Sequence, residues 1–345
     1  MLKRPALFLI FLLASFAGFS QYNQTARERK DSIRAQYIEE YPDHFAVWPM
    51  LKYRSLTFKM VDTKQDKRVN FNPNNTYKTG AGFYLFNVSF EITFSIPVPV
   101  RDESIYGEAK STDLQVNILS KSVGLDLYYQ NYSGYYRDDK DVEVPKGEPY
   151  PDRSDVVTKN MGLSAFYVWN NEKLSIRSSY NYADRQKKSA GSFILYGTIN
   201  SFTAEGDSAL LPASAQQVLG TGSDFNHLRI TTVGLAPGYT YNLVLKRIFL
   251  NGTFALGPAS HWIYSQSEAG KEHRDVQLNT AYTFRLAAGY SGDRFFVGSG
   301  IVWQSRVVKF QDIRVENSTG VVRLVVGYRF REKGFLKKNA INIKI

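Results

Sequence analysis

Residues 276–290 have the sequence VQLNTAYTFRLAAGY, whose side chains alternate regularly between two kinds. The apolar set comprises Val276, Leu278, Thr280, Tyr282, Phe284, Leu286, Ala288 and Tyr290. The polar or small set comprises Gln277, Asn279, Ala281, Thr283, Arg285, Ala287 and Gly289. Because successive side chains of a β-strand point to opposite faces, the stretch predicts a strand with one apolar and one polar face.

The residues that follow repeat the pattern after a tight turn at 291–293. In residues 294–307, one face carries Phe295, Val297, Ile301 and Trp303, and the other carries Gly298, Gly300, Gln304 and Arg306. Strands of this length joined by so short a turn are typical of a membrane-spanning β-barrel, whose strands alternate lipid-facing and lumen-facing residues. We therefore predict a barrel hairpin that is apolar outside and polar inside.

Twelve strands of this kind are predicted, over residues 52–62, 78–86, 88–97, 112–121, 123–131, 159–169, 173–183, 228–241, 247–258, 276–290, 294–307 and 318–331. Their connections alternate long and short: the long ones are 63–77, 98–111, 133–158, 184–227, 259–275 and 308–317, and the short ones are 87, 122, 170–172, 242–246 and 291–293. Outer-membrane barrels have short periplasmic turns and longer extracellular loops, whereas a soluble β-sandwich need not keep its long loops on one side. The prediction is an all-β, transmembrane, antiparallel up-and-down β-barrel with both termini in the periplasm.

The aromatic residues support this prediction, because the chain has 23 Tyr and 23 Phe but only 4 Trp. The strand directions put Trp169, Tyr241, Tyr290, Phe295, Tyr328 and Phe330 at the lower boundary of the membrane. They put Tyr129, Tyr182, Trp262 and Trp303 near the upper boundary. Aromatic side chains at two levels are expected where a protein meets both lipid–water interfaces.

The N-terminus has the features of a secretory signal peptide. Lys3 and Arg4 precede an apolar run from Ala6 to Phe19, and the small residues before Gln21 predict cleavage after Ser20. A membrane anchor is the alternative, but the run is short for a bilayer. We expect residues 21–51 to form a periplasmic segment with a short helix, 52–331 the outer-membrane barrel, and 332–345 a periplasmic tail.

The composition excludes several kinds of chemistry. The chain has no cysteine, so it has no disulfide framework, thiolate metal site or lipid-modified N-terminus. The formal charge of +11 becomes +9 once Lys3 and Arg4 are removed. Nucleic acid is not expected as a partner, because an exported chain without a dense Lys/Arg run does not meet it. We expect a monomer without metal or cofactor that contacts outer-membrane lipid.

Charged residues are predicted to line the lumen. By parity the inward cations are Lys59, Arg177, Arg247, Arg285, Arg306, Arg323 and Arg329, and their acidic counterparts are Glu91 and Asp126. Such an interior favours a small anionic solute, a carboxylate or a phosphate. Alternatively, these side chains pair with one another and fill a narrow barrel, which is the interpretation we favour. The expected role is a narrow channel or a surface binding and scaffold barrel with a cationic lumen.

An enzymatic role is not expected. The alternative is an outer-membrane lipid-modifying enzyme that uses His261 as a base, since Ser260 precedes it and Ser265 is close. However, Ile263 follows His261 on its own strand face, and no acid is placed to orient the imidazole. A histidine at the membrane rim beside Trp262 is the non-catalytic interpretation. A further alternative is an assembly partner of a surface-glycan or secretion system, for which crosslinking through residues 184–227 is the test; an envelope protein would then be its partner.

Four segments resemble a known family. They are FNPNN at 71–75, KTGAGFY at 78–84, YGEAKSTDLQ at 106–115 and DLYYQNYSGYY at 126–136. The chain is similar here to domain-of-unknown-function family 4421, found in Bacteroidota and treated as an outer-membrane barrel. The resemblance runs from about Tyr37 to the end and is most specific in the first half. It implies a fold and a location, and it transfers no catalytic residue.

Overall fold

The computed structural model describes residues 25–332, except for 26, 63–67, 86–87, 100, 140–143, 212–223 and 311–312. The predicted signal peptide therefore lies outside the described residues, as does the predicted tail after Glu332. The N-terminal segment forms a helix over residues 27–37, as predicted, and the chain then turns at 42–43 into the first long strand. No helix among the described residues has the length and apolar character needed to cross a membrane.

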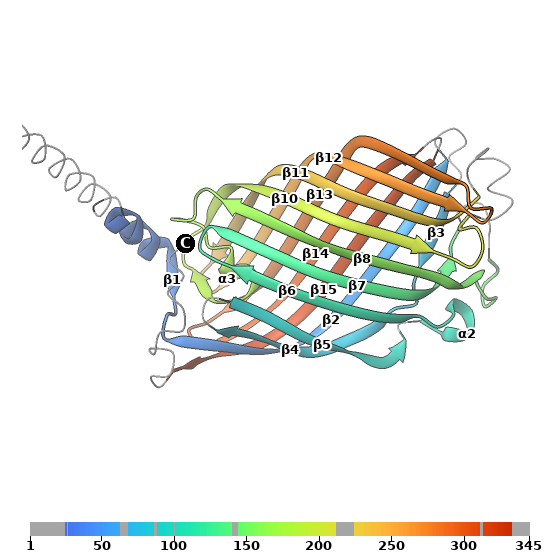
Figure 1. Ribbon diagram of the computed structural model, residues 1–345. Helices are drawn as coiled ribbons and strands as arrows, with labels where there is room; N and C mark the ends of the chain where they lie inside the picture. The colour runs from blue at the N-terminus through green and yellow to red at the C-terminus, as the bar shows by residue number, and fades with distance from the viewer. Residues whose placement is uncertain are drawn as a thin grey trace, which may run out of the picture.

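Twelve antiparallel strands form a closed ring in which each strand pairs with the next (Figure 1). They are β2 (His44–Asp62), β4 (Thr76–Leu85), β5 (Val88–Pro99), β6 (Lys110–Leu119), β7 (Val123–Arg137), β8 (Asp152–Val168), β10 (Ala190–Glu205), β11 (Phe225–Leu245), β12 (Ile248–Ser267), β13 (Glu272–Ser291), β14 (Phe295–Phe310) and β15 (Ile313–Arg331). Pairing of β15 with β2 closes the ring. The weakest seam lies between β5 and β6, where, among the described residues, only Val88–Phe90 and Val116–Ile118 pair with each other, at the end of these strands nearest their periplasmic turns. The predicted transmembrane up-and-down barrel is confirmed.

The short elements lie at the two ends of the barrel. β1 (Ile38–Glu40), α3 (Arg177–Tyr180) and β9 (Asp184–Gln186) lie at the end where β2 starts and β15 finishes (Figure 1). β3 (Arg68–Asn72) and α2 (Glu103–Tyr106) lie at the opposite end, beside the longer loops. Because short turns and termini mark the periplasmic side of such barrels, we call the first end periplasmic and the second extracellular.

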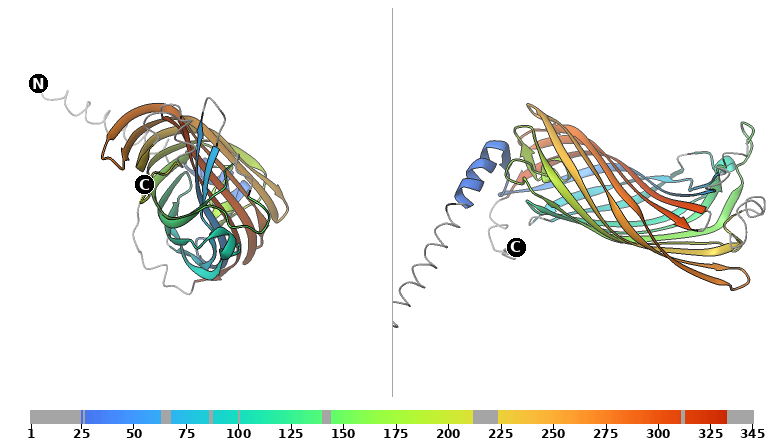
Figure 2. Two further views of the ribbon diagram at one scale, coloured as in Figure 1. Left: turned by 90° about the vertical axis from the view of Figure 1, so that its right-hand side faces the viewer. Right: turned by 90° about the horizontal axis from the view of Figure 1, so that it is seen from above.

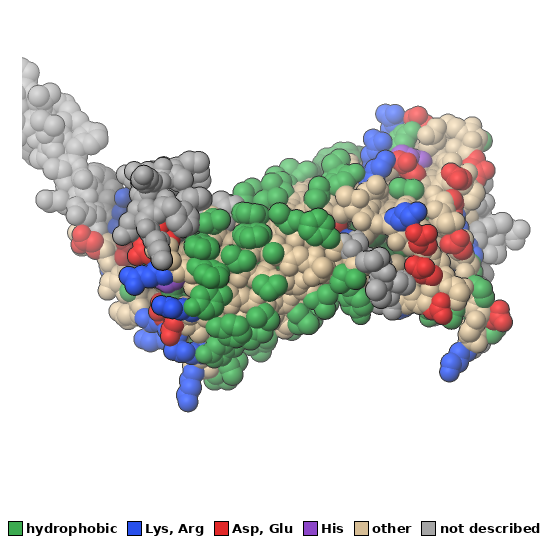
Figure 3. All heavy atoms as spheres, turned by 90° about the horizontal axis from the view of Figure 1, so that it is seen from below, with side chains coloured by type: hydrophobic (Ala, Val, Ile, Leu, Met, Phe, Trp, Pro, Cys, Tyr) green, Lys and Arg blue, Asp and Glu red, His purple; other side chains and the backbone are tan. Residues whose placement is uncertain are grey.

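The wall has the two faces that the alternation predicts. Phe284 and Trp303 are register partners on β13 and β14 and face outward, whereas the adjacent Arg285 is only 7% exposed and faces the lumen. The space-filling view shows apolar side chains around the middle of the barrel and charged side chains gathered at both ends (Figure 3). Figure 2 shows the strands inclined to the barrel axis, as ring closure requires.

One predicted strand is wrong. Residues 173–183 do not join the wall, because the strand that pairs with β8 is β10. The predicted tight turn at 170–172 instead begins a long periplasmic connection, residues 169–189, which enters the lumen (Figure 1). Its alternating apolar residues are buried inside the barrel, so Tyr182 lies at the periplasmic end and not in the upper aromatic belt.

Several strand ends also differ from the prediction. The first wall strand begins at His44, earlier than the predicted Lys52, and the predicted loop 259–275 is mostly strand with a turn at 268–271. The strands continue past the lipid-facing stretch because their backbone groups keep pairing above the membrane. Lipid-facing alternation therefore marks only the middle part of each strand.

Candidate functional site

Residues 169–189 form a plug inside the periplasmic mouth. Its apolar side chains Leu174, Ile176, Tyr180 and Tyr182 are buried against inward residues of the wall. The ring of Tyr182 stacks on that of Phe296, with centroids 4.5 Å apart. The plug and the wall thus share one apolar cluster, which fills the lumen at this level. The wall members include Trp48, Phe166, Phe249 and Phe296.

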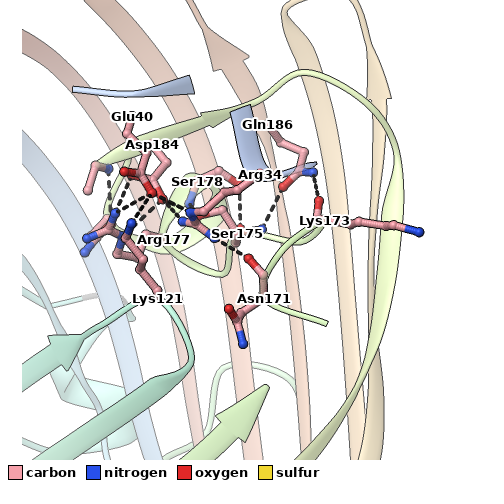
Figure 4. Close-up of polar contacts among 12 residues, drawn as sticks. Arg34, Glu40, Lys121, Asn171, Lys173, Ser175, Arg177, Ser178, Asp184 and Gln186 are labelled. Atoms are coloured by element: carbon pink, nitrogen blue, oxygen red, sulfur yellow. Dashed lines mark hydrogen bonds and ion pairs between the residues drawn. The ribbon is translucent and has the colours of Figure 1, made fainter. Parts of the chain in front are cut away.

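Asp184 holds the plug in shape. Its carboxylate accepts hydrogen bonds from Nε of Arg177 at 3.0 Å, from NH2 of Arg177 at 2.7 Å and from the Ser175 hydroxyl at 2.5 Å (Figure 4). The backbone N–H of Ser175 donates to Oε1 of Gln186 at 2.8 Å. These contacts satisfy polar groups that would otherwise be buried without partners, so the plug keeps one conformation.

The N-terminal segment crosses over the plug. β1 pairs antiparallel with β9, and the Lys187 amide donates to the Tyr37 carbonyl at 2.7 Å. Arg34 reaches from the helix to Asp184, at 3.2 Å, and to the Asn171 carbonyl (Figure 4). Two segments far apart in the sequence are therefore locked together at the periplasmic mouth.

Glu40 connects this segment to the barrel wall. It forms ion pairs with Arg34, with Lys121 in the β6–β7 turn at 3.1 Å, and with Arg177 at 3.8 Å. Partial burial by itself would raise the pKa of the Glu40 carboxyl, but the cations Arg34 and Lys121 outweigh burial and hold the pKa below its ordinary value of 4.5. Glu40 is therefore charged at neutral pH and attracts all three cations.

The middle of the lumen contains a layer of ion pairs. Glu91 accepts from Lys52 at 2.6 Å and from Arg323 at 2.7 Å. Arg285 pairs with Asp126 from across the barrel, and Arg54 pairs with Asp113. A cavity of about 80 Å³ lies among these residues. Its volume suffices for a few water molecules or one small solute.

Cations outnumber carboxylates in this layer. Among the described residues, the inward cations of this layer are Lys52, Arg54, Lys78, Arg285, Arg306 and Arg323, and the carboxylates are Glu91, Asp113 and Asp126. Within the described parts of the chain, the hydrogen-bond partners of Arg306 are neutral: the Tyr128 hydroxyl at 2.7 Å and Oδ1 of Asn317 at 3.5 Å. The interior thus has a positive formal balance.

A second apolar cluster closes the extracellular half. The ring of Phe58 stacks on Phe71 with centroids 4.3 Å apart and lies 5.8 Å from Phe202. Leu210 and Leu211 follow β10 and fold inward onto this cluster, where they are 0% and 1% exposed. The ion-pair layer therefore lies between two apolar layers.

Most of the predicted lumen residues do lie in the lumen, either on the wall or on the plug. Arg285, Arg306, Arg323 and Arg329 face inward from the wall, as do Glu91 and Asp126. Arg177 lies in the lumen, but it projects from the plug and not from a strand. Arg329 donates to the carbonyls of Tyr182 and Gly292 at 2.8 and 2.6 Å, so it fastens the plug.

Two predictions of lumen residues are wrong. Lys59 faces outward beside its register partner Glu316, to which it is ion-paired at 2.6 Å. β2 carries large side chains on both faces, so the alternation of its sequence does not show which face is inward. Arg247 lies in the exposed β11–β12 turn and pairs with Asp293 at 2.9 Å. A residue in a two-residue turn has no strand parity to fix its direction.

Sequence reasoning missed Lys52, Arg54, Asp113 and Asp184. The signal for Lys52 and Arg54 was their shared parity with Trp48 and Phe58, which is informative only once the inward face of β2 is known. Asp184 was missed because residues 173–183 were predicted to be a wall strand, and because its partner Arg34 lies on the N-terminal helix.

His261 is fully buried and faces the lumen. Its Nδ1 lies 2.9 Å from the Thr232 hydroxyl, and the alternation of β12 puts Trp262 on the opposite, outer face. It is therefore not a rim histidine beside Trp262. No group of three or more His, Cys, Asp or Glu side chains in the described part of the chain is arranged to hold a metal ion.

The strands form a closed antiparallel ring with an apolar exterior and a layer of ion pairs in its lumen, and both ends of the ring lie on one side. This arrangement defines a bacterial outer-membrane β-barrel. The chain matches the family described as domain of unknown function DUF4421 over residues 29–330, and it belongs to that family. The predicted resemblance to this family is confirmed.

Solved barrels share a coarse likeness. The outer-membrane protease OmpT from Escherichia coli has 12% identity and a TM-score of 0.41, with 85% of this chain and 98% of that chain covered. The translocator domain of the autotransporter NalP from Neisseria meningitidis has 8% identity and a TM-score of 0.34, with 91% and 98% covered. No curated protein matches the chain.

Proposed function

We propose that the protein is a closed outer-membrane barrel that serves as a binding scaffold and not as a constitutively open channel. The supporting observation is the filling of the lumen at two levels by the apolar clusters around Tyr182 and Phe58. A solute crossing the barrel would have to lose its hydration at both levels, and transferring a charged group into apolar surroundings is costly. The binding surfaces are then the exterior and the two ends.

Conductance of the refolded protein in a planar bilayer tests this proposal. The unmodified protein is expected to show no steady current. A variant that replaces residues 171–187 with a short Gly-Ser linker and carries Phe58→Ala and Phe202→Ala provides the comparison, because it removes the plug and two large rings of the extracellular cluster. Steady current through the unmodified protein, of the size seen for the opened variant, would overturn the proposal.

A second candidate is a site for a small anionic solute in the central cavity. It is favoured by the positive balance of the cavity lining, in which Lys52, Arg54, Arg285 and Arg323 face the carboxylates Glu91 and Asp126. Inorganic phosphate or acetate at millimolar concentration should then raise the Tm of the unmodified protein but not that of Arg54→Gln. Arg247→Gln removes an exposed cation and is the matched control. Equal responses of all three proteins would exclude the site.

The placement of His261 does not favour the lipid-modifying alternative. A lipid on the outer wall meets Trp262, whereas His261 contacts Thr232 inside the lumen. His261→Ala is expected to leave any lipid hydrolysis in detergent micelles unchanged, and loss of a measurable activity would restore the enzyme alternative.

A partner protein of the envelope stays a prediction of the sequence. Asp207 and Ser208 are exposed after β10, at the extracellular end, and are suitable sites for a photo-crosslinker. A specific crosslinked protein in intact cells would support such a partner, and the absence of any product from several positions would argue against it.

A further inference from the structure

The outer wall contains an apolar groove that the proposed scaffold function does not use. It has a volume of about 560 Å³, and its outward-facing lining comes from β6, β7, β8, β10 and β11. The lining includes Leu114, Leu127, Tyr129, Met161, Ile199, Ser201 and Thr231. Ser201 and Thr231 are register partners, so two small side chains face outward together and leave room between larger neighbours. A volume of this size is that of a ligand site.

Two basic residues follow the groove at its extracellular side. Lys159 lies two residues from Met161 on β8, and Arg229 lies two residues from Thr231 on β11. Each is therefore about 7 Å farther along its strand than the groove residue. Thr203 of β10 is the register partner of Lys159 on one side and of Arg229 on the other. The two basic residues are therefore two strand spacings, or about 10 Å, apart.

The charges of these two residues are not neutralised by the protein. Lys159 and Arg229 are exposed, and neither has a carboxylate partner among the described residues. The acidic side chain Glu205 lies 3.4 Å from His227. The guanidinium of Arg229 lies 5.8 Å from the ring of Tyr264, and the neighbouring Arg274 is ion-paired with Glu272 at 3.1 Å. Lys159 and Arg229 are therefore the two cations above the groove that no described carboxylate neutralises.

We propose that this surface binds one outer-leaflet lipid with a phosphate headgroup. The phosphate lies between Lys159 and Arg229, and an acyl chain lies in the groove below them. The apolar groove and the two cations are adjacent. The groove lies on the membrane side and the cations on the extracellular side, which matches the positions of the acyl chain and the headgroup of an outer-leaflet lipid. Basic clusters next to membrane-spanning segments bind anionic headgroups by the same attraction.

Native mass spectrometry of the delipidated protein in detergent tests the proposal. Dioleoyl phosphatidic acid should remain bound in one copy, more tightly than dioleoyl phosphatidylcholine. Lys159→Gln together with Arg229→Gln should weaken phosphatidic acid binding roughly tenfold or more, since each basic group near a membrane surface contributes about 1 kcal/mol. Circular dichroism and heat-dependent gel mobility confirm that the variants fold.

The matched control is Lys309→Gln together with Arg314→Gln. These residues are register partners on β14 and β15 at the same end of the barrel, so the control removes the same charge elsewhere. It should change binding less than twofold. Equal loss in both double variants, or equal retention of phosphatidylcholine and phosphatidic acid by the unmodified protein, would overturn the proposal.

A third variant separates the groove from the charges. Ser201→Phe fills the groove without altering charge and should weaken retention of phosphatidic acid. Inorganic phosphate at the same concentration should not displace the lipid, because it lacks the acyl chain. Displacement by phosphate, or unchanged binding in Ser201→Phe, would show that the cations bind free phosphate and that the groove takes no lipid chain.

Discussion

Arg177 and Asp184 make a two-point contact inside the barrel, with NH2 of the arginine 2.7 Å from Oδ1 and Nε 3.0 Å from Oδ2 of the carboxylate. Both side chains are buried, and both belong to the plug. The same carboxylate accepts from Arg34 of the N-terminal helix at 3.2 Å. Asp184 thus connects two parts of the plug with each other and connects the plug with the N-terminal helix that covers it.

Asp184→Asn should reduce the free energy of unfolding by about 1.5–3 kcal/mol, because it removes the buried carboxylate that accepts from both Arg177 and Arg34 and leaves them Glu40 as an acidic partner. Guanidinium unfolding in detergent micelles measures the change. The control is Asp293→Asn, whose carboxylate is exposed and pairs with Arg185 and Arg247. An exposed pair contributes about 0–1 kcal/mol, so equal losses in the two variants would contradict the role given to Asp184.

The pair of Arg285 and Asp126 can be tested by a double-mutant cycle. Arg285→Met alone should destabilise the barrel by about 3–5 kcal/mol, because Asp126 is left buried without its ion-pair partner. Arg285→Met together with Asp126→Leu should recover most of that loss, because neither charge remains. Additive losses in the cycle would show that the two side chains do not interact.

Gly82 should not tolerate a side chain. A Cβ at this position would lie 2.0 Å from the indole nitrogen of Trp48, its register partner on β2, and the indole is 1% exposed. Gly82→Ala should cost about 1–3 kcal/mol through overpacking. At Gly252 a Cβ meets no atom within 4 Å, so Gly252→Ala should change stability by less than about 0.5 kcal/mol. Thermal unfolding of both variants distinguishes the sites.

Docking of the N-terminal segment should weaken in acid. The pKa of Glu40 is below 4.5 in the folded protein, so its contribution is fully present above that value and is lost as the pH falls through the folded pKa. Hydrogen exchange of the amides in β1 and β9, corrected for intrinsic rates, should show protection that is lost as the pH falls below 4.5. In Glu40→Gln the protection of these amides should already be reduced at pH 7. If that variant loses protection in acid to the same extent as the unmodified protein, groups other than Glu40 cause the loss.

The wall of the barrel was predictable wherever one face meets lipid. In residues 276–290 and 295–307 most side chains of one parity are apolar, and the structure puts Phe284 and Trp303 outside and Arg285 and Arg306 inside. The prediction failed where both faces of a segment are apolar, as in β2. It also failed at 173–183, because burial inside the lumen and exposure to lipid require the same alternation.

The ion pairs could not be predicted from the sequence, because most join distant segments. Lys52 and Arg323 lie on neighbouring strands, but their common partner Glu91 lies on β5. Arg285 and Asp126 meet across the lumen from β13 and β7. Which inward residues oppose one another depends on strand register and on the inclination of the strands, and neither is encoded in a single strand.

The sequence by itself determined the antiparallel barrel and eleven of its twelve wall strands, since a period of two between lipid-facing and lumen-facing residues is a local property of each strand. Only the tertiary structure decided that residues 169–189 fill the periplasmic mouth and that two apolar clusters close the lumen. The physical reason is that an apolar side chain gains similarly from lipid and from a packed interior. The choice between them therefore depends on the space that the other strands leave.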